Sequence, residues 1–266
     1  MIGRVFVAAS LLFSSAAIAE SVELQPTDSW VLDYAAAECL AYREYSQAGK
    51  KLVLAIEPSP TMDSFEIAVL RDRSGPFYAE ELQGSVDFGN GRVDAWLLHY
   101  GHAKQDVYRF RISAAELDQA RLAPSVRLRA DSSRDFTFSL SNVPALLDEL
   151  AACNRDLIQY WNVDGERDGK IAVPAKGDVR SVFSANDFPQ QALDRRQQGD
   201  AQFLLLIDEQ GKIAGCHVLK PSGVPVFDAM GREAIQERAK FKPAMDSAGK
   251  ALRSAVVTPL VRWRLE

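Results

Sequence analysis

The sequence has few of the residues that catalytic and metal sites require. Only three cysteines and three histidines occur among its 266 residues. The cysteines, at positions 39, 153 and 216, lack the paired spacing of a zinc site. No nucleophile-elbow, phosphate-loop or zinc-protease motif is present. We therefore expect a protein without catalytic residues, cofactor or bound metal.

The three histidines do not change this expectation. His99 and His102 lie three residues apart, which is a ligand spacing on a helix, but their surroundings predict a strand that runs into a turn at Gly101. His217 adjoins Cys216, but neighbours on a strand point to opposite faces, so this pair should not meet. For His99 and His102, surface or hydrogen-bonded histidines are the interpretation that we favour.

Long apolar runs are also missing, apart from one near the N-terminus. Arg4 is followed by the apolar residues 5–19, which end in Ala17-Ile18-Ala19. A basic residue, a short apolar run and this ending are typical of a signal peptide cleaved before Glu20. A bilayer span takes about 20 apolar residues, so we expect export as a soluble protein. The alternative is an uncleaved N-terminus that anchors the chain in the inner membrane.

An excess of basic residues is absent as well. The chain has 31 Lys and Arg against 36 Asp and Glu, a net charge of −5. Residues 181–266 hold 12 basic and 10 acidic side chains, so the acidic excess lies in residues 1–180. This balance argues against nucleic acid and against electrostatic docking on anionic lipid.

A disulfide bond is expected, because an exported chain meets an oxidising compartment. We favour a bond between Cys39 and Cys153, since both precede the expected domain boundary and both lie in segments that look structured. This bond would stabilise the fold by about 4 to 5 kcal/mol in the chain-entropy model. The alternative is three buried thiols. Cys216 lies in an apparent strand and is interpreted as a core residue.

Residues 20–161 predict a strand-rich domain with a terminal helix. Apolar runs with partial period-two alternation, bounded by turn residues, predict strands at 52–56, 65–70, 93–98, 107–112, 126–129 and 136–140. Asn90-Gly91 predicts a tight primed turn between two of them.

Two helices are expected in this domain. Ser113 is typical of an N-cap, with Glu116 at the capping-box position. Ser141 or Asn142 should cap a longer helix to about Tyr160, with Pro144 in its first turn. Its apolar positions recur at helical spacing and should cover the strand layer: Leu146, Leu147, Leu150, Cys153 and Leu157. Residues 162–180 are polar and contain glycines and a proline, which predicts a linker.

The last third of the chain, residues 181–266, begins with a predicted helix. Phe188-Pro189 followed by Ala192-Leu193 indicates its start, because proline in the first turn loses no hydrogen bond. We expect the helix to end at Gly199-Asp200.

A hairpin follows. Apolar residues 203–207 lead into the loop Asp208–Lys212, where Gly211 should take a left-handed conformation. In the return strand, one face should carry Ala214, Cys216 and Val218, and the other Ile213, Gly215, His217 and Leu219. Pro221-Ser222-Gly223 breaks this strand.

A second helix and a final strand complete the chain. The helix has an apolar stripe of Phe227, Met230, Ala234 and Ile235. Gly231 costs this helix about 1 kcal/mol relative to Ala, so we expect it to permit close approach to the sheet. Residues 253–265 predict a strand, and because Pro259 lacks an N–H group, an edge position fits better than a central one.

This order of elements, with Phe-Pro and Ala-Leu at the first helix, Ser222-Gly223 after the hairpin and a proline in the final strand, resembles the C-terminal domain of the TonB family. That domain is the periplasmic half of energy transducers that contact outer-membrane transporters. The resemblance implies an α+β fold for residues 181–266 and a place in the periplasm of a Gram-negative cell envelope. The family's long proline-rich arm is missing here, and residues 162–180 are short by comparison.

The resemblance also assigns a role to the final strand. In the family, a short transporter segment is thought to dock by strand addition, in which backbone hydrogen bonds give affinity. The partner-binding residues implied are Pro259, Leu260, Val261, Arg262, Trp263 and Arg264. A purely structural interpretation is that Pro259 and the arginines protect the edge against aggregation.

Two functions remain open. In the first, the chain is an exported TonB-like protein-interaction module for an envelope partner such as an outer-membrane receptor, acting in transport. In the second, the C-terminal domain is a structural or dimerisation unit, and the N-terminal domain binds an unknown ligand. The second function does not involve energy transduction.

Overall fold

The computed structural model describes residues 22–73, 80–102, 104–163 and 171–265, with the backbone alone at His102. The expected signal segment, residues 1–19 with cleavage before Glu20, lies outside these ranges. Within them, no helix combines the length and the apolar character needed to cross a bilayer. Helices and strands are both present, in agreement with an α+β class.

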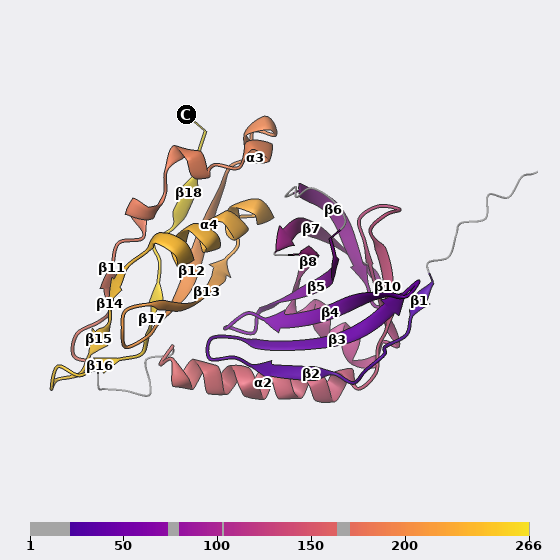
Figure 1. Ribbon diagram of the computed structural model, residues 1–266, viewed down its shortest axis with the longest axis horizontal. Helices are drawn as coiled ribbons and strands as arrows, with labels where there is room; N and C mark the ends of the chain where they lie inside the picture. Colours follow the sequence, from indigo (N-terminus) through magenta and orange to yellow (C-terminus); the bar gives the residue numbers. More distant parts are fainter. Residues whose placement is uncertain (1–21, 74–79, 103, 164–170, 266) are drawn as a thin grey trace, which may run out of the picture.

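The N-terminal part is a single curled sheet of ten strands, drawn in indigo to magenta in Figure 1. In space the strands run β1-β10-β9-β6-β7-β8-β5-β4-β3-β2, and only the β1–β10 pair is parallel. Their bounds are β1 Glu23–Leu24, β2 Val31–Tyr34, β3 Cys39–Gln47, β4 Lys50–Pro58, β5 Ser64–Asp72, β6 Glu80–Asp87, β7 Arg92–His102, β8 Gln105–Ser113, β9 Ser125–Arg129 and β10 Asp135–Ser139.

Five of the six predicted strand segments lie within a strand, and the sixth, 136–140, extends one residue beyond the end of β10 at Ser139. The sequence pattern did not single out β1, β2, β3 and β6. In β3, Cys39, Ala41 and Tyr45 are buried while the positions between them are partly exposed. Charged residues at Arg43 and Glu44 interrupt the apolar alternation that would have marked this strand.

The hairpin between β6 and β7 differs from the predicted tight turn. Asp87 pairs with Arg92, so four residues form the loop. Positive φ angles occur at Gly89 and Gly91, at 87° and 152°, and not at Asn90. A two-residue type I′ turn, which Asn-Gly favours, needs positive φ at both central residues, so the Asn90-Gly91 prediction was wrong in its geometry.

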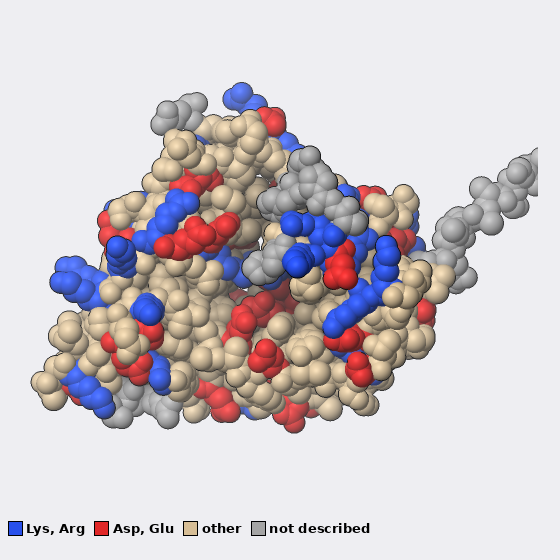
Figure 2. Space-filling view, in the orientation of Figure 1, with Lys and Arg blue, Asp and Glu red and all other residues tan. Residues whose placement is uncertain are grey.

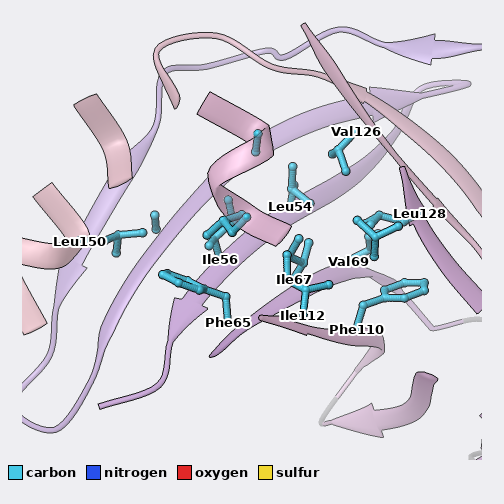
Figure 3. Close-up of a cluster of buried hydrophobic side chains, with 14 of the residues drawn as sticks. Leu54, Ile56, Phe65, Ile67, Val69, Phe110, Ile112, Val126, Leu128 and Leu150 are labelled. Carbon is cyan, nitrogen blue, oxygen red and sulfur yellow. The ribbon is translucent and has the colours of Figure 1, made fainter. Parts of the chain in front are cut away.

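The predicted helices of this part are present. Ser113 caps α1 (Ala114–Asp118) in a capping box with Glu116, and the short helix η1 (Gln119–Leu122) follows. Asn142 is the N-cap of α2 (Val143–Tyr160), but no side chain makes a capping hydrogen bond there. The expected apolar residues of α2 are buried in the same core as Leu54, Ile56 and Leu128 of the sheet (Figure 3).

A disulfide bond joins Cys39 of β3 to Cys153 of α2, the pair favoured from the sequence. Cys216 is a free, buried cysteine. Burial raises the pKa of its thiol to about 12, so the thiol stays protonated. The bond fastens α2 to the sheet whose core it covers.

The C-terminal part is smaller and contains several short elements. Their bounds are β11 Lys176–Gly177, η2 Arg180–Val182, η3 Ala185–Asp187, α3 Gln190–Asp194, β12 Gly199–Ile207, β13 Ile213–Lys220, α4 Pro225–Arg238, β14 Phe241–Lys242, β15 Ala244–Met245, β16 Ala251–Leu252, β17 Ser254–Val257 and β18 Val261–Trp263. β12 is the central strand, with β13 on one side and β17 and β18 on the other.

Two details differ from the sequence expectation. The first helix, α3, ends at Asp194 and not at Gly199-Asp200, because these two residues already pair with β18. In the expected linker 162–180, Lys176 and Gly177 pair with β14, and Val173 bridges to Met245. The described end of that segment is therefore hydrogen-bonded to the C-terminal part.

The central sheet of the C-terminal part is covered on both faces. Phe203, Leu205 and Ile207 share a buried cluster with Ile235 of α4. The alternate residues Leu204 and Leu206 belong to the core cluster of the N-terminal part. The two parts therefore pack through this sheet, and Figure 2 shows acidic side chains in the hollow between them.

Candidate functional site

The predicted final strand, residues 253–265, is two strands separated by Thr258, Pro259 and Leu260. Thr258 holds the break in place, since its N–H group donates to the carbonyl of Phe203 at 2.9 Å and its hydroxyl accepts from the Phe203 N–H at 3.1 Å. The single continuous strand was therefore a wrong prediction, because Pro259 cannot donate to a ladder.

β18 lies at an edge, as the sequence predicted for the proline-containing segment. It pairs antiparallel with β12, from Gly199 opposite Trp263 to Ala201 opposite Val261. Within the described ranges no other strand pairs with β18. One side of its backbone is thus without a strand neighbour.

The side chains of β18 alternate as expected. Trp263 is buried and stacks on Phe227 of α4 with ring centroids 4.9 Å apart. Phe183 and Phe188 meet the same indole edge-on, at 5.9 and 5.8 Å. Arg262 and Arg264 face outward and are exposed. The aromatic cluster fixes the strand while its charged face stays open to solvent.

A groove with a volume of about 700 Å³ runs beside β18. Its two walls come from segments far apart in the sequence. They are formed by Val179, Arg180, Phe183, Ser184, Ala185 and Phe188 on one side and by Pro259, Leu260, Val261, Arg262, Trp263 and Arg264 on the other. All six residues predicted to bind a partner thus lie together on one wall.

The second wall was not foreseen from the sequence. Phe183 and Phe188 lie outside any periodic pattern, and the short helices η2 and η3 lack the length that makes helical spacing detectable. Ser184 and Asp187 do form a capping box in η3, and this spacing was the only available signal.

Asp187 fastens this wall to helix α4. Its carboxylate accepts from the Ser184 N–H at 2.7 Å and forms an ion pair with Arg238 at 2.8 Å. Arg238 also donates to the carbonyl of Val182 at 3.0 Å. The hydrogen bond from Arg238 lowers the pKa of Asp187 to about 2, so the wall is held by a charged pair at neutral pH.

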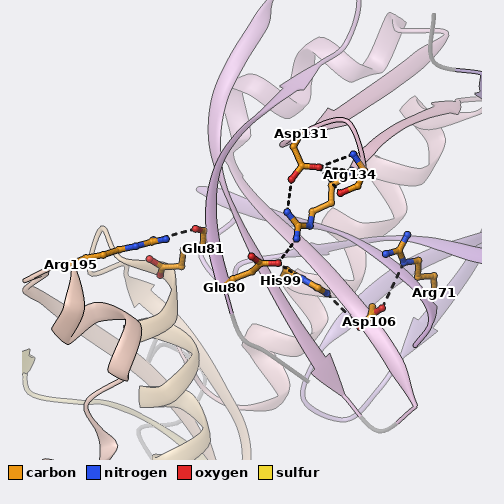
Figure 4. A network of polar contacts seen from close by, with 9 residues as sticks. Arg71, Glu80, Glu81, His99, Asp106, Asp131, Arg134 and Arg195 are labelled. Carbon is orange, nitrogen blue, oxygen red and sulfur yellow. Dashed lines mark hydrogen bonds and ion pairs between the residues drawn. The ribbon is translucent and has the colours of Figure 1, made fainter. Parts of the chain in front are cut away.

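The N-terminal part reaches helix α4 through Glu81 of β6. The Glu81 carboxylate, which is buried, accepts a hydrogen bond from the N–H group of Val226 in the first turn of α4. Arg195, just after α3, donates to the carbonyl of Glu81 at 3.2 Å (Figure 4). Burial raises the pKa of Glu81. A carboxylate at a helix N-terminus satisfies an N–H group that the helix cannot pair internally.

A second polar contact between the parts surrounds Glu66 of β5. Its carboxylate pairs with Arg109 at 2.5 Å, Arg111 at 2.6 Å and Arg232 of α4 at 3.4 Å. Burial alone raises the pKa of Glu66, but the three guanidinium groups outweigh burial and hold it well below its usual range. Arg111 also lies 3.8 Å from Asp228 of α4.

His99 contacts two acidic side chains and an aromatic ring. His99 lies between Glu80 at 3.0 Å and Asp106 at 3.5 Å and stacks on Tyr108 (Figure 4). β7 continues through Gly101 to His102 instead of turning at Gly101. No group of three or more possible metal ligands occurs in the part of the chain that the structure describes.

His217 and Cys216 lie on opposite faces of β13, as predicted. His217 approaches the carbonyl of Ala37 in the N-terminal part at 2.9 Å, whereas Cys216 belongs to the cluster under α4. The two side chains therefore serve two different packing interfaces and form no dyad.

Residues 184–265 match the family model described as Gram-negative bacterial TonB protein C-terminal. This confirms the resemblance found in the sequence, and the match covers both walls of the groove from Ser184 onward. The family is a protein-interaction domain of transport proteins and not an enzyme. No curated protein matches the chain.

Proposed function

We propose, from the match of residues 184–265 to the TonB C-terminal family, that this chain is an exported periplasmic interaction module. It binds an extended segment of an envelope protein, such as an outer-membrane receptor, by adding that segment to β18. Its role in transport is to recognise this partner.

The observation that carries the proposal is the open edge of β18 beside the groove. An extended segment that pairs with an edge strand gains backbone hydrogen bonds, and a neighbouring groove selects its side chains. Here the groove contains all of residues 259–264. The opposite face of the sheet packs on the N-terminal part, so an added segment would approach β18 along its open edge.

The alternative, a structural or dimerisation unit with a ligand-binding N-terminal domain, stays a prediction. The contacts of Glu66 and Glu81 with α4 fit a structural role for the interface. They do not involve β18, so both roles are compatible with one chain.

A photo-crosslinking residue placed at Arg262 tests the proposal in the envelope of the native cells. We expect a crosslinked envelope protein, identified by mass spectrometry, from Arg262 but not from a matched probe at Lys220, which is exposed at the other edge on β13. Introducing Val261→Asp or Arg262→Pro should abolish capture, in protein whose thermal unfolding shows it to be folded. Retained capture by both variants would contradict strand addition.

A further inference from the structure

The groove beside β18 contains basic side chains and no acidic ones. Its charged lining residues are Arg180, Arg262 and Arg264. The whole chain has the opposite balance, with more Asp and Glu than Lys and Arg. The charge of the groove is therefore a local property of its two walls.

Two of these arginines lack an internal partner. Arg264 pairs with Asp200 at 2.7 Å and donates to the carbonyl of Gly199 at 3.2 Å. The guanidinium groups of Arg180 and Arg262 are exposed and have no hydrogen bond or ion pair with any described residue. Because the two arginines come from opposite walls, a peptide segment lying in the groove would pass between two unpaired guanidinium groups.

The wall that contains Arg262 also has a hydrogen-bond donor without an acceptor in the described part of the chain. The indole N–H of Trp263 is buried without an acceptor among the described residues. Buried donors normally have partners in folded proteins. The groove thus offers an unused donor and positive charge, and no acidic side chain of the described residues lines it.

We propose that the segment captured by β18 is acidic, with Asp or Glu side chains that pair with Arg262 and Arg180. This inference rests on the proposed function, since it names the chemistry of the same partner. Guanidinium groups bind carboxylates through paired, charge-assisted hydrogen bonds. Phe183, Phe188 and Leu260 supply the apolar surface for the intervening side chains. Complementary charge also speeds the encounter of the two proteins.

Selection from a random dodecapeptide library displayed on phage tests the inference without a known partner. The full chain is immobilised, and the clones that it binds are sequenced. The selection is then repeated with the soluble Val261→Asp variant as competitor, which removes the clones that bind without an intact β18. We expect the clones that depend on β18 to be enriched in Asp and Glu. A synthetic peptide from the selection, labelled with a fluorophore, then gives an affinity by anisotropy.

Neutralising either side of the contact should weaken binding by a similar factor. Replacing Arg262 or Arg180 by Gln should each reduce the affinity about two- to fivefold, as expected for an exposed ion pair. Replacing the acidic residues of the peptide by Gln should do the same. The matched control is Arg155→Gln on α2, an exposed arginine outside the groove, which should leave the affinity unchanged. Raising the salt concentration should weaken the binding of the acidic peptide more than the binding of its Gln analogue.

The outcomes separate the two proposals. Clones that depend on β18 but are neutral or basic, or an affinity that is unchanged in Arg262→Gln and Arg180→Gln, would overturn the acidic partner and leave strand addition standing. A selection that yields no clone dependent on β18 would overturn strand addition, and the acidic partner with it.

Discussion

At the scale of single residues, Glu66 is a carboxylate with three arginine neighbours. Its carboxylate is mostly buried, with the side chain 13% exposed, and is shared by Arg109, Arg111 and Arg232. Taking one carboxylate and three guanidinium groups out of water is costly. The arrangement persists because each charge has an opposite charge within hydrogen-bond distance or close to it. Removing the one carboxylate would leave three partly buried guanidinium groups without this shared partner.

Glu66→Gln should therefore destabilise the protein by about 1 to 3 kcal/mol, between the scales for an exposed and a buried ion pair, because the cluster is partly exposed. The midpoint of chemical unfolding measures this change. Asp94→Asn is the matched control, because its pair with Arg92 at 3.4 Å is exposed and should be worth under about 1 kcal/mol. Equal midpoints for the two variants would contradict a structural role for the Glu66 cluster.

Asp187 makes part of the stability dependent on pH. Its pKa of about 2 lies below the ordinary value of 3.8, chiefly because of the hydrogen bond from Arg238. Since the folded pKa is the lower one, the stabilisation is complete above about pH 5 and is lost as the pH falls toward 2. Asp187→Asn should lower the unfolding free energy at pH 7 by about 1 kcal/mol and flatten its slope between pH 5 and 2.

Chemical unfolding at a series of pH values measures this slope. Asp156→Asn, an exposed position on α2, is the control and should leave it unchanged. Glu66 also has a depressed pKa, so the slope of the Asp187 variant should be reduced and not abolished. An unchanged slope in Asp187→Asn would show that the Arg238 pair does not hold the groove wall.

At the scale of elements, the distance between α4 and β12 is set by Gly231. A Cβ atom at this position would lie 2.5 Å from the Phe203 ring, which is fully buried. Real Cβ contacts do not approach so closely. The helix therefore accepts the cost of glycine, about 1 kcal/mol relative to Ala, and gains the close packing that the sequence analysis expected.

Gly231→Ala should destabilise the protein by about 1 to 3 kcal/mol, because overpacking outweighs the better helix propensity. Thermal unfolding measures the effect. The double variant with Phe203→Leu is the control, since the smaller side chain relieves the clash and the two changes should not add. A stabilised Gly231→Ala variant would mean that the helix shifts freely on the sheet.

Of the two walls of the groove, the sequence predicts only the one formed by residues 259–264. Alternation and Pro259 were enough to place residues 259–264 on an edge, because both depend on local backbone chemistry. The break at Thr258 depends on its hydrogen bonds to Phe203, and the second wall depends on aromatic contacts between Phe183 and Trp263. Such contacts join residues distant in sequence, and no local pattern encodes them.

At the scale of the whole molecule, the packing of the two parts could not be predicted from the sequence, again because it depends on contacts between residues far apart in the chain. No local pattern marks Glu81 or His217 as an interface residue, because their partners lie in the other part of the chain. The alternation in β12 predicted a strand, and only the structure shows that both of its faces are covered. The TonB resemblance supplied the order of elements in residues 184–265 and nothing about residues 20–161.

The disulfide bond should contribute to stability at this scale. Cys39 and Cys153 are 114 positions apart, and the loop that they close should stabilise the fold by about 4 to 5 kcal/mol in the chain-entropy model. Replacing both by Ser should lower the unfolding midpoint of the protein. Reductant should lower the midpoint of the wild type and leave that of the double variant unchanged. Equal wild-type midpoints with and without reductant would contradict the bond.

Capture of an extended segment at β18 is the central claim, and backbone amide hydrogen exchange tests it most directly. The exchange rates are measured by mass spectrometry with and without a saturating peptide from the phage selection. The account predicts slower exchange in residues 261–263 of β18, because an added strand pairs with its open edge. Slower exchange at β13 or in the N-terminal sheet, with β18 unchanged, would contradict it.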